Sequence, residues 1–125
     1  MLERIKILLF GIPPAAKVSN KMLERIIKRD YPNKEDLIKQ KLKTIESDSR
    51  KSKNRISAGV LKIANGNINE IDALVEKSKI DFRDIISMAE YPRYNNTGLS
   101  DISDAGLKNL YLADWKEYSR WSNKP

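Results

Sequence analysis

Apolar residues recur at intervals of three and four along almost the whole chain, and this spacing constrains the fold more than any other feature of the sequence. Ile56, Val60 and Ile63 form one such series, and another begins at Leu23. An α-helix brings residues with this spacing onto one face, whereas a half-buried strand needs strict alternation. Because no alternating segment of useful length is present, the sequence predicts an all-α protein.

Turn-forming residues divide the apolar pattern into short segments. Asp30-Tyr31-Pro32, Asn65-Gly66 and Tyr91-Pro92 each follow an apolar series. Proline cannot continue a helix, and glycine readily takes the left-handed conformation that ends one. The helices are therefore expected to be short, with short connections between antiparallel neighbours.

The residues that precede several series are typical helix N-caps. They are Ser19 or Asn20, Asn67 and Asp81. Glu70 follows Asn67 at the spacing of a capping box, and Ile80 and Ile85 flank Asp81 at the spacing of a hydrophobic staple. A last helix begins at about Asp101 or Asp104. We therefore predict a compact, single-domain bundle of five to seven short helices.

The chain's 125 residues fit one domain, which we expect to span residues 1–125. Residues 47–54 are all polar and predict a flexible polar loop or a frayed, solvated helix within it. The apolar run within residues 1–16 is too short for a secretory signal, so a short amphipathic helix is predicted there. No apolar run approaches the roughly 20 residues of a membrane span. With no cysteine present, the sequence favours a cytoplasmic protein.

The chain contains neither histidine nor cysteine, which removes the side chains behind most enzyme chemistry. Imidazole titrates near neutral pH, and imidazole and thiolate are the usual zinc ligands and activated nucleophiles. The remaining carboxylates, lysines, serines and tyrosines show no recognisable catalytic spacing. We therefore predict no catalytic residue, no metal site and no cofactor.

The net charge of +7 is unevenly distributed. Residues 1–65 hold 16 Lys and Arg against 7 Asp and Glu, a net charge of +9, whereas residues 66–125 hold 8 against 10, a net charge of −2. Residues 39–55 contain seven basic residues and only two acids, Glu46 and Asp48. The basic residues are Lys39, Lys41, Lys43, Arg50, Lys51, Lys53 and Arg55. Such a cluster is a candidate surface for an acidic protein partner or for nucleic-acid phosphates. Runs of charge also form plain solvated faces.

The last predicted helix contains four of the chain's nine aromatic residues. Tyr111, Trp115 and Tyr118 share one helix face, which we expect to close the core. Trp121 is predicted to lie away from that face, near the end of the chain. Because tryptophan is common at the energetic centre of protein interfaces, Trp121 is a candidate partner contact.

Three carboxylate arrangements offer an enzymatic alternative. Asp81 with Asp84 and Asp101 with Asp104 are i, i+3 pairs, and Asp114-Trp115-Lys116 matches a fragment of many nucleases. Acids at helix starts also stabilise the helix dipole, and the nuclease fragment belongs on a strand. A carboxylate-dependent hydrolase is therefore the third hypothesis for function.

Three segments of the second half resemble a pattern in small, uncharacterised bacterial all-helical proteins. They are residues 59–67, residues 81–92 and residues 114–121. The resemblance implies a bacterial, cytoplasmic helical protein and carries no site. Our first hypothesis is a non-enzymatic binding or regulatory module that engages a protein partner through the basic residues. Nucleic-acid binding through the same residues is the alternative.

Overall fold

A computed structural model of the chain describes residues 16–96 and 103–125. Within these residues every regular element is helical, so the predicted all-α class is confirmed. In chain order the elements are α2 (Asn20–Asp30), α3 (Glu35–Leu42), α4 (Arg50–Ala64), the 3-10 turn η1 (Ile68–Glu70), α5 (Ile71–Ile80), α6 (Phe82–Glu90), α7 (Pro92–Asn96) and α8 (Asp104–Asn123). The amphipathic helix predicted near the start falls on residues 1–15, outside the described residues.

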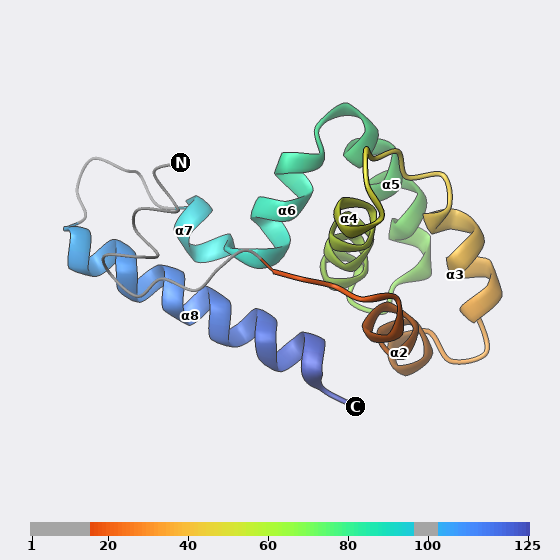
Figure 1. Cartoon of the computed structure of the whole chain (residues 1–125), viewed down its shortest axis with the longest axis horizontal. Helices are drawn as coiled ribbons and strands as arrows, with labels where there is room; N and C mark the ends of the chain where they lie inside the picture. Colours follow the sequence, from red (N-terminus) through yellow and green to blue (C-terminus); the bar gives the residue numbers. More distant parts are fainter. Residues whose placement is uncertain (1–15, 97–102) are drawn as a thin grey trace.

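Helix α4 occupies the middle of the molecule, and α2, α5 and α6 pack around it (Figure 1). Helix α3 lies against α5 and α2, and α8 runs along one side in contact with α7, α6 and α2. None of the helices in the described part of the chain is both long enough and apolar enough to cross a bilayer.

The apolar core forms around the buried face of α4. Ile56, Val60 and Leu61 of α4 are buried together with Ile26 of α2 and Ile85 of α6. Full burial of each such side chain stabilises the fold by about 1.5–3 kcal/mol before the entropy cost. The predicted spacing of apolar residues is therefore the spacing of the core.

Side chains predicted to cap helices do so at three positions. Ser19 accepts a hydrogen bond from Met22 N at 3.1 Å, and Asp81 accepts one from Arg83 N at 3.1 Å. Asn67 accepts a hydrogen bond from Asn69 N. It caps the 3-10 turn η1, however, and α5 begins later, at Ile71. The last helix begins at Asp104, with Ser103 as its N-cap.

Helix α4 ends in the left-handed conformation that the Asn65-Gly66 pair predicted. Asn65 has φ 50° and Gly66 has φ 84°. The Tyr31 hydroxyl accepts a hydrogen bond from Gly66 N at 3.2 Å and donates one to the Leu61 carbonyl at 3.5 Å. The end of α2 is thereby fastened to the end of α4.

The polar loop predicted over residues 47–54 is wrong in extent. Helix α4 begins at Arg50, because the Ser49 hydroxyl accepts a hydrogen bond from Ser52 N at 3.2 Å and caps the helix. Asn54 is a buried contact, and its amide donates to the Val18 carbonyl at 3.2 Å. Only residues 47–49 of the predicted loop precede the helix.

The predicted hydrophobic staple around Asp81 is also wrong. Ile85 is completely buried, but Ile80 is 88% exposed. The buried residues of α5 include Val75 and Ser78, and Ile80 lies on another face of that helix. Sequence spacing alone does not show which way the chain turns at Asp81.

Candidate binding surface

The seven basic residues predicted as a binding surface separate into two groups. Lys39, Lys41 and Arg55 form ion pairs with acids of the same chain. Lys43, Arg50, Lys51 and Lys53 gather at the N-terminal end of α4 instead. The second group has no acidic partner within the described residues.

Arg55 forms a buried ion pair that joins α4 to α6. Its Nε and Nη2 atoms donate to the two carboxylate oxygens of Glu90 at 2.7 and 2.8 Å, and Glu90 is only 5% exposed. The hydrogen bonds to Glu90 raise the pKa of Arg55 above its usual range. Removing either partner would leave a buried charge unpaired, so we assign Arg55 a role in stabilising the folded state.

Lys41 links α3 to α5 through an ion pair at the surface, where Asp72 is exposed. Its Nζ lies 2.8 and 2.9 Å from the two carboxylate oxygens of Asp72. Lys39 pairs with Glu24 at 3.7 Å, and both side chains are exposed, so this contact contributes little.

The second group is brought together by contacts at the first turn of α4. Lys53 Nζ donates to the Lys43 carbonyl at 3.1 Å, which holds the chain before α4 against the helix. Lys43, Arg50 and Lys51 are exposed, and none of them forms an ion pair within residues 16–96 and 103–125.

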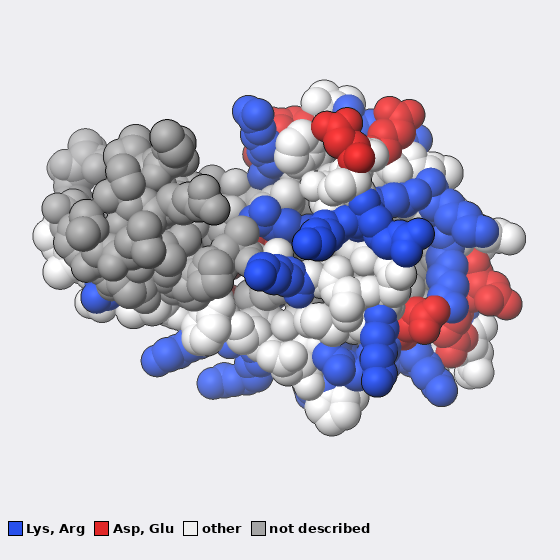
Figure 2. All heavy atoms as spheres, in the orientation of Figure 1, with Lys and Arg blue, Asp and Glu red and all other residues white. Residues whose placement is uncertain are grey.

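The start of α2 adds two further cations to this surface. Asn54 binds the Val18 carbonyl and the Asn20 side chain, so the segment that begins α2 lies against the first turns of α4. We define the basic face as the cations that surround this contact: Lys17, Lys21, Lys43, Arg50, Lys51 and Lys53. Figure 2 shows Lys and Arg side chains spread over this part of the molecule, with acidic side chains mainly toward its margins.

The backbone of α4 adds to the positive potential of the basic face. A helix N-terminus carries about half a positive charge, which acidic residues in the first turn usually offset. The first turn of α4 contains no acid, although Asp48 precedes it. The backbone amides of Arg50 and Lys51 have no acceptor among the described residues.

Trp121, the candidate partner contact, is half-buried. It packs at the edge of the apolar core, and its ring lies 5.6 Å from that of Tyr118. The guanidinium of Arg29 lies 5.4 Å from its centroid, a cation–π distance. Trp121 is thus an internal contact of α8.

Trp115 is the exposed tryptophan, at 45%. Tyr118 is buried and Tyr111 stacks on Tyr91 at 5.3 Å, so only part of the predicted aromatic face closes the core. The buried residues of α8 are Asp114, Tyr118 and Ser122, which places the centre of the contact face, at Tyr118, about 60° from Trp115. The aromatic spacing did not reveal that this face also contains a carboxylate.

Asp114 of the nuclease-like fragment has a structural role. It is 1% exposed, and its two oxygens accept hydrogen bonds from Arg93 N at 3.2 Å and Tyr94 N at 3.0 Å. Arg93 Nη1 also donates to it at 2.9 Å. These contacts cap the start of α7 from α8.

Of the other two carboxylate pairs, only Asp81 and Asp84 are fully described, and both have structural contacts. Asp81 caps α6, and Asp84 lies 3.5 Å from Lys77. Asp101 and the side chain of Asp104 lie outside the description. Within the described residues, no three acidic side chains come together in a group that would hold a metal ion.

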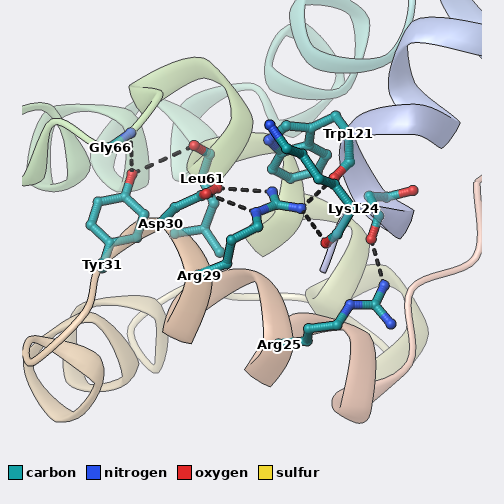
Figure 3. A network of polar contacts seen from close by, with 9 residues as sticks. Arg25, Arg29, Asp30, Tyr31, Leu61, Gly66, Trp121 and Lys124 are labelled. Carbon is teal, nitrogen blue, oxygen red and sulfur yellow. Dashed lines mark hydrogen bonds and ion pairs between the residues drawn. The ribbon is translucent and has the colours of Figure 1, made fainter.

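Sequence reasoning missed a second polar network, which Figure 3 shows between α2 and the end of α8. Arg25 Nη2 donates to the Ser122 carbonyl at 2.6 Å, and Arg29 Nη1 donates to the Trp121 carbonyl at 2.6 Å. The acceptors are backbone oxygens more than ninety residues away along the chain. No side-chain pattern marks such acceptors, although the i, i+4 spacing of the two arginines places them on one face.

Comparisons with protein-family models, with curated proteins and with solved structures gave no match for this chain. The resemblance to small bacterial helical proteins therefore remains a hypothesis. Function has to be argued from the surface itself.

Proposed function

We propose that this chain is a non-enzymatic binding or regulatory module that engages an acidic surface of a protein partner through the basic face. The supporting observation is the group of exposed cations Lys43, Arg50 and Lys51 at the positive end of α4, unpaired within the described residues. Unpaired cations attract an acidic partner, speed its encounter and orient it. The proposed surface does not include Arg55 and Lys41, because ion pairs with Glu90 and Asp72 offset their charges.

We also propose that this binding occurs in the bacterial cytoplasm. The absence of cysteine and the resemblance to bacterial helical proteins support the cytoplasm of a bacterium. Acidic protein surfaces are abundant there, and an interaction of this kind weakens as salt screens the charges.

Photo-cross-linking tests the proposal at the basic face itself. A photoreactive amino acid replaces Ser47, which is exposed beside the basic face, and the protein is irradiated in nuclease-treated lysate of its source cells. The expected product is a protease-sensitive, nuclease-resistant adduct. Changing Lys43, Arg50 and Lys51 together to glutamine should abolish it.

A charge-matched variant controls for net charge. Lys34, Lys116 and Arg120 are exposed and lie outside the basic face, so changing them to glutamine removes the same charge. The adduct should persist in this variant. Equal loss of the adduct in both variants would show that only total charge matters, and would contradict the proposed surface.

Nucleic-acid binding is the second candidate, and one observation favours it. Exposed cations surround the two amides of Arg50 and Lys51 that lack acceptors in the described part, and this combination suits a phosphate. If about three phosphates are neutralised, the logarithm of the affinity for duplex DNA should fall with the logarithm of salt with a slope of about −3. Nuclease-sensitive adducts from position 47 that form in lysate without nuclease treatment would favour this candidate over a protein partner.

A further inference from the structure

The C-terminal end of α4 holds a chemically reactive pair of residues. Asn65 and Gly66 follow the last turn of α4, and both are exposed to solvent. The side-chain amide carbon of an asparagine can be attacked by the backbone nitrogen of the next residue, and glycine has no side chain to hinder that nitrogen. Asn65 is the only asparagine in the chain that glycine follows. It is therefore the asparagine most open to deamidation.

The reaction needs only this pair and water. Gly66 N gives up its proton and forms a bond to Asn65 Cγ, and the side-chain nitrogen takes up a proton and leaves as ammonia. The product is a cyclic succinimide. Water then opens the ring at one of its two carbonyl carbons. Addition at Cγ breaks the new bond and gives aspartate, whereas addition at the main-chain carbon breaks the original peptide bond and gives isoaspartate.

The folded conformation of Asn65 opposes this attack. Asn65 has φ 50° and ψ 48°, in the left-handed helical region. At this ψ the Gly66 nitrogen lies nearly anti to the Asn65 Cβ across the Cα–C bond, so it faces away from Cγ. The ring can close only after rotation about that bond, which takes Asn65 out of the left-handed conformation. The end of α4 must therefore open before Asn65 reacts.

The hydroxyl of Tyr31 holds this end closed. Figure 3 shows Tyr31 bonded to both Gly66 and Leu61. Gly66 N, the attacking atom, donates to the Tyr31 hydroxyl at 3.2 Å. The Tyr31 side chain is buried in the apolar core at the end of α2, so the acceptor is fixed in place. Opening of the α4 end therefore has to break this hydrogen bond.

Neither product suits the place where it forms. A Cβ atom on Gly66 would lie 3.7 Å from the Asp30 carbonyl, so the turn packs against the end of α2. Burial raises the pKa of Tyr31, and the nearby charges of Asp30 and Glu70 raise it further. The last turn of α4 also carries about half a negative charge. A further carboxylate is unfavourable here, and isoaspartate in addition lengthens the main chain within the turn.

We propose that Asn65 is a site of spontaneous deamidation, that opening of the α4 end sets its rate, and that the Tyr31 hydroxyl restrains this opening. Conversion to aspartate or isoaspartate weakens the attachment of α2 to α4. This inference does not depend on the proposed function.

Prolonged incubation of the natural chain at mildly alkaline pH tests the site. Mass spectrometry of the digested protein identifies the deamidated residue and separates aspartate from isoaspartate. Asn65 should react while Asn67 and Asn69 stay intact, and it should react at least about tenfold more slowly than in the same chain unfolded in guanidinium chloride. Reaction in the unfolded chain alone would overturn the proposed site. Equal rates in both states would overturn control by the fold.

Tyr31→Phe tests the restraint. Loss of the hydrogen bond to Gly66 N should make deamidation of Asn65 about fivefold faster. Ile85→Val, which removes a buried methyl group from α6, is the matched control because it also weakens the fold slightly. It should leave the rate at Asn65 unchanged. Equal acceleration in both variants would mean that Asn65 reacts only through global unfolding, and an unchanged rate in Tyr31→Phe would overturn the role of the hydroxyl.

Hydrogen exchange of the isoaspartate form, separated by cation exchange, tests the consequence. Amides in the last turn of α4 should exchange several-fold faster than in the natural chain, and those in the middle of α8 should keep their rates. Unchanged exchange at the end of α4 would show that the modification does not weaken the attachment.

Discussion

At the scale of single residues, two buried tyrosines show how the same side chain takes opposite roles. The Tyr31 hydroxyl bonds to Gly66 N and the Leu61 carbonyl, whereas the Tyr118 hydroxyl is buried without a partner in the described part of the protein. Both phenols have a raised pKa, chiefly because burial disfavours the phenolate. For Tyr118 the nearby Glu90 raises it further.

These environments predict opposite effects of removing the hydroxyl. Tyr118→Phe removes an unsatisfied polar atom, so the free energy of unfolding should stay the same or rise by up to about 1 kcal/mol. Tyr31→Phe removes two hydrogen bonds and should lower it by about 1–2 kcal/mol. Urea unfolding at neutral pH measures both. A clear destabilisation by Tyr118→Phe would show that this hydroxyl has a partner.

The raised pKa of Tyr118 also predicts a pH dependence. The folded state keeps the phenol protonated while the unfolded chain releases the proton near its ordinary pKa of 10.0, so stability is complete below about pH 10 and falls above it. Tyr118→Phe should make this loss of stability at alkaline pH less steep. The raised pKa of Tyr31 should account for part of the loss that remains. Unfolding measured at neutral pH and at about pH 11 checks the difference.

At the scale of helices, the sequence predicts what is local and misses what is not. The N-caps Ser19 and Asp81 and the left-handed end at Asn65 depend on neighbouring residues, and they are confirmed. The clamp from Arg25 to Ser122 joins residues 97 positions apart, which no local pattern contains. The exposure of Trp115 and the partial burial of Trp121 depend on how α8 is rotated against its neighbours, which only packing decides.

The close approach of α4 and α6 predicts a steric effect at Gly59. A Cβ atom there would lie 3.1 Å from Ile85 Cγ2 and 3.4 Å from Ala89 Cβ, and both neighbours are buried. Gly59→Val should therefore lower the free energy of unfolding by about 2–3 kcal/mol. Ala73→Val on the exposed side of α5 should cost only about 0.5 kcal/mol. Similar losses in both variants would mean that α4 and α6 are not in close contact.

The contact between α7 and α8 predicts a second loss of stability. Arg93 N and Tyr94 N donate to different carboxylate oxygens of Asp114. Asparagine has only one acceptor oxygen, so it cannot accept both hydrogen bonds in this geometry. Asp114→Asn should lower the free energy of unfolding by about 2–3 kcal/mol. Asp84→Asn, an exposed acid 3.5 Å from Lys77, should change it by less than about 0.5 kcal/mol. An unchanged Asp114→Asn protein would contradict the capping role.

At the scale of the whole molecule, part of the basic charge of the first half serves the fold and part of it is exposed. Lys41 and Arg55 fasten helices to one another, and Arg25 and Arg29 hold the end of α8. Six others form the basic face around the start of α4. The sequence predicted four of these six and also included Lys39, Lys41 and Arg55, because the acids that pair with those three lie on other helices.

The central claim is that the basic face, and not total charge, is what a partner recognises. The most direct measurement is a nuclear magnetic resonance titration of the labelled natural chain with oligoglutamate, which reports every backbone amide separately. The account predicts that the largest shifts fall on Lys43, Arg50, Lys51 and their neighbours. Shifts spread evenly over all lysines and arginines, or centred on the exposed Ile80 at the end of α5 and Phe82 at the start of α6, would contradict it.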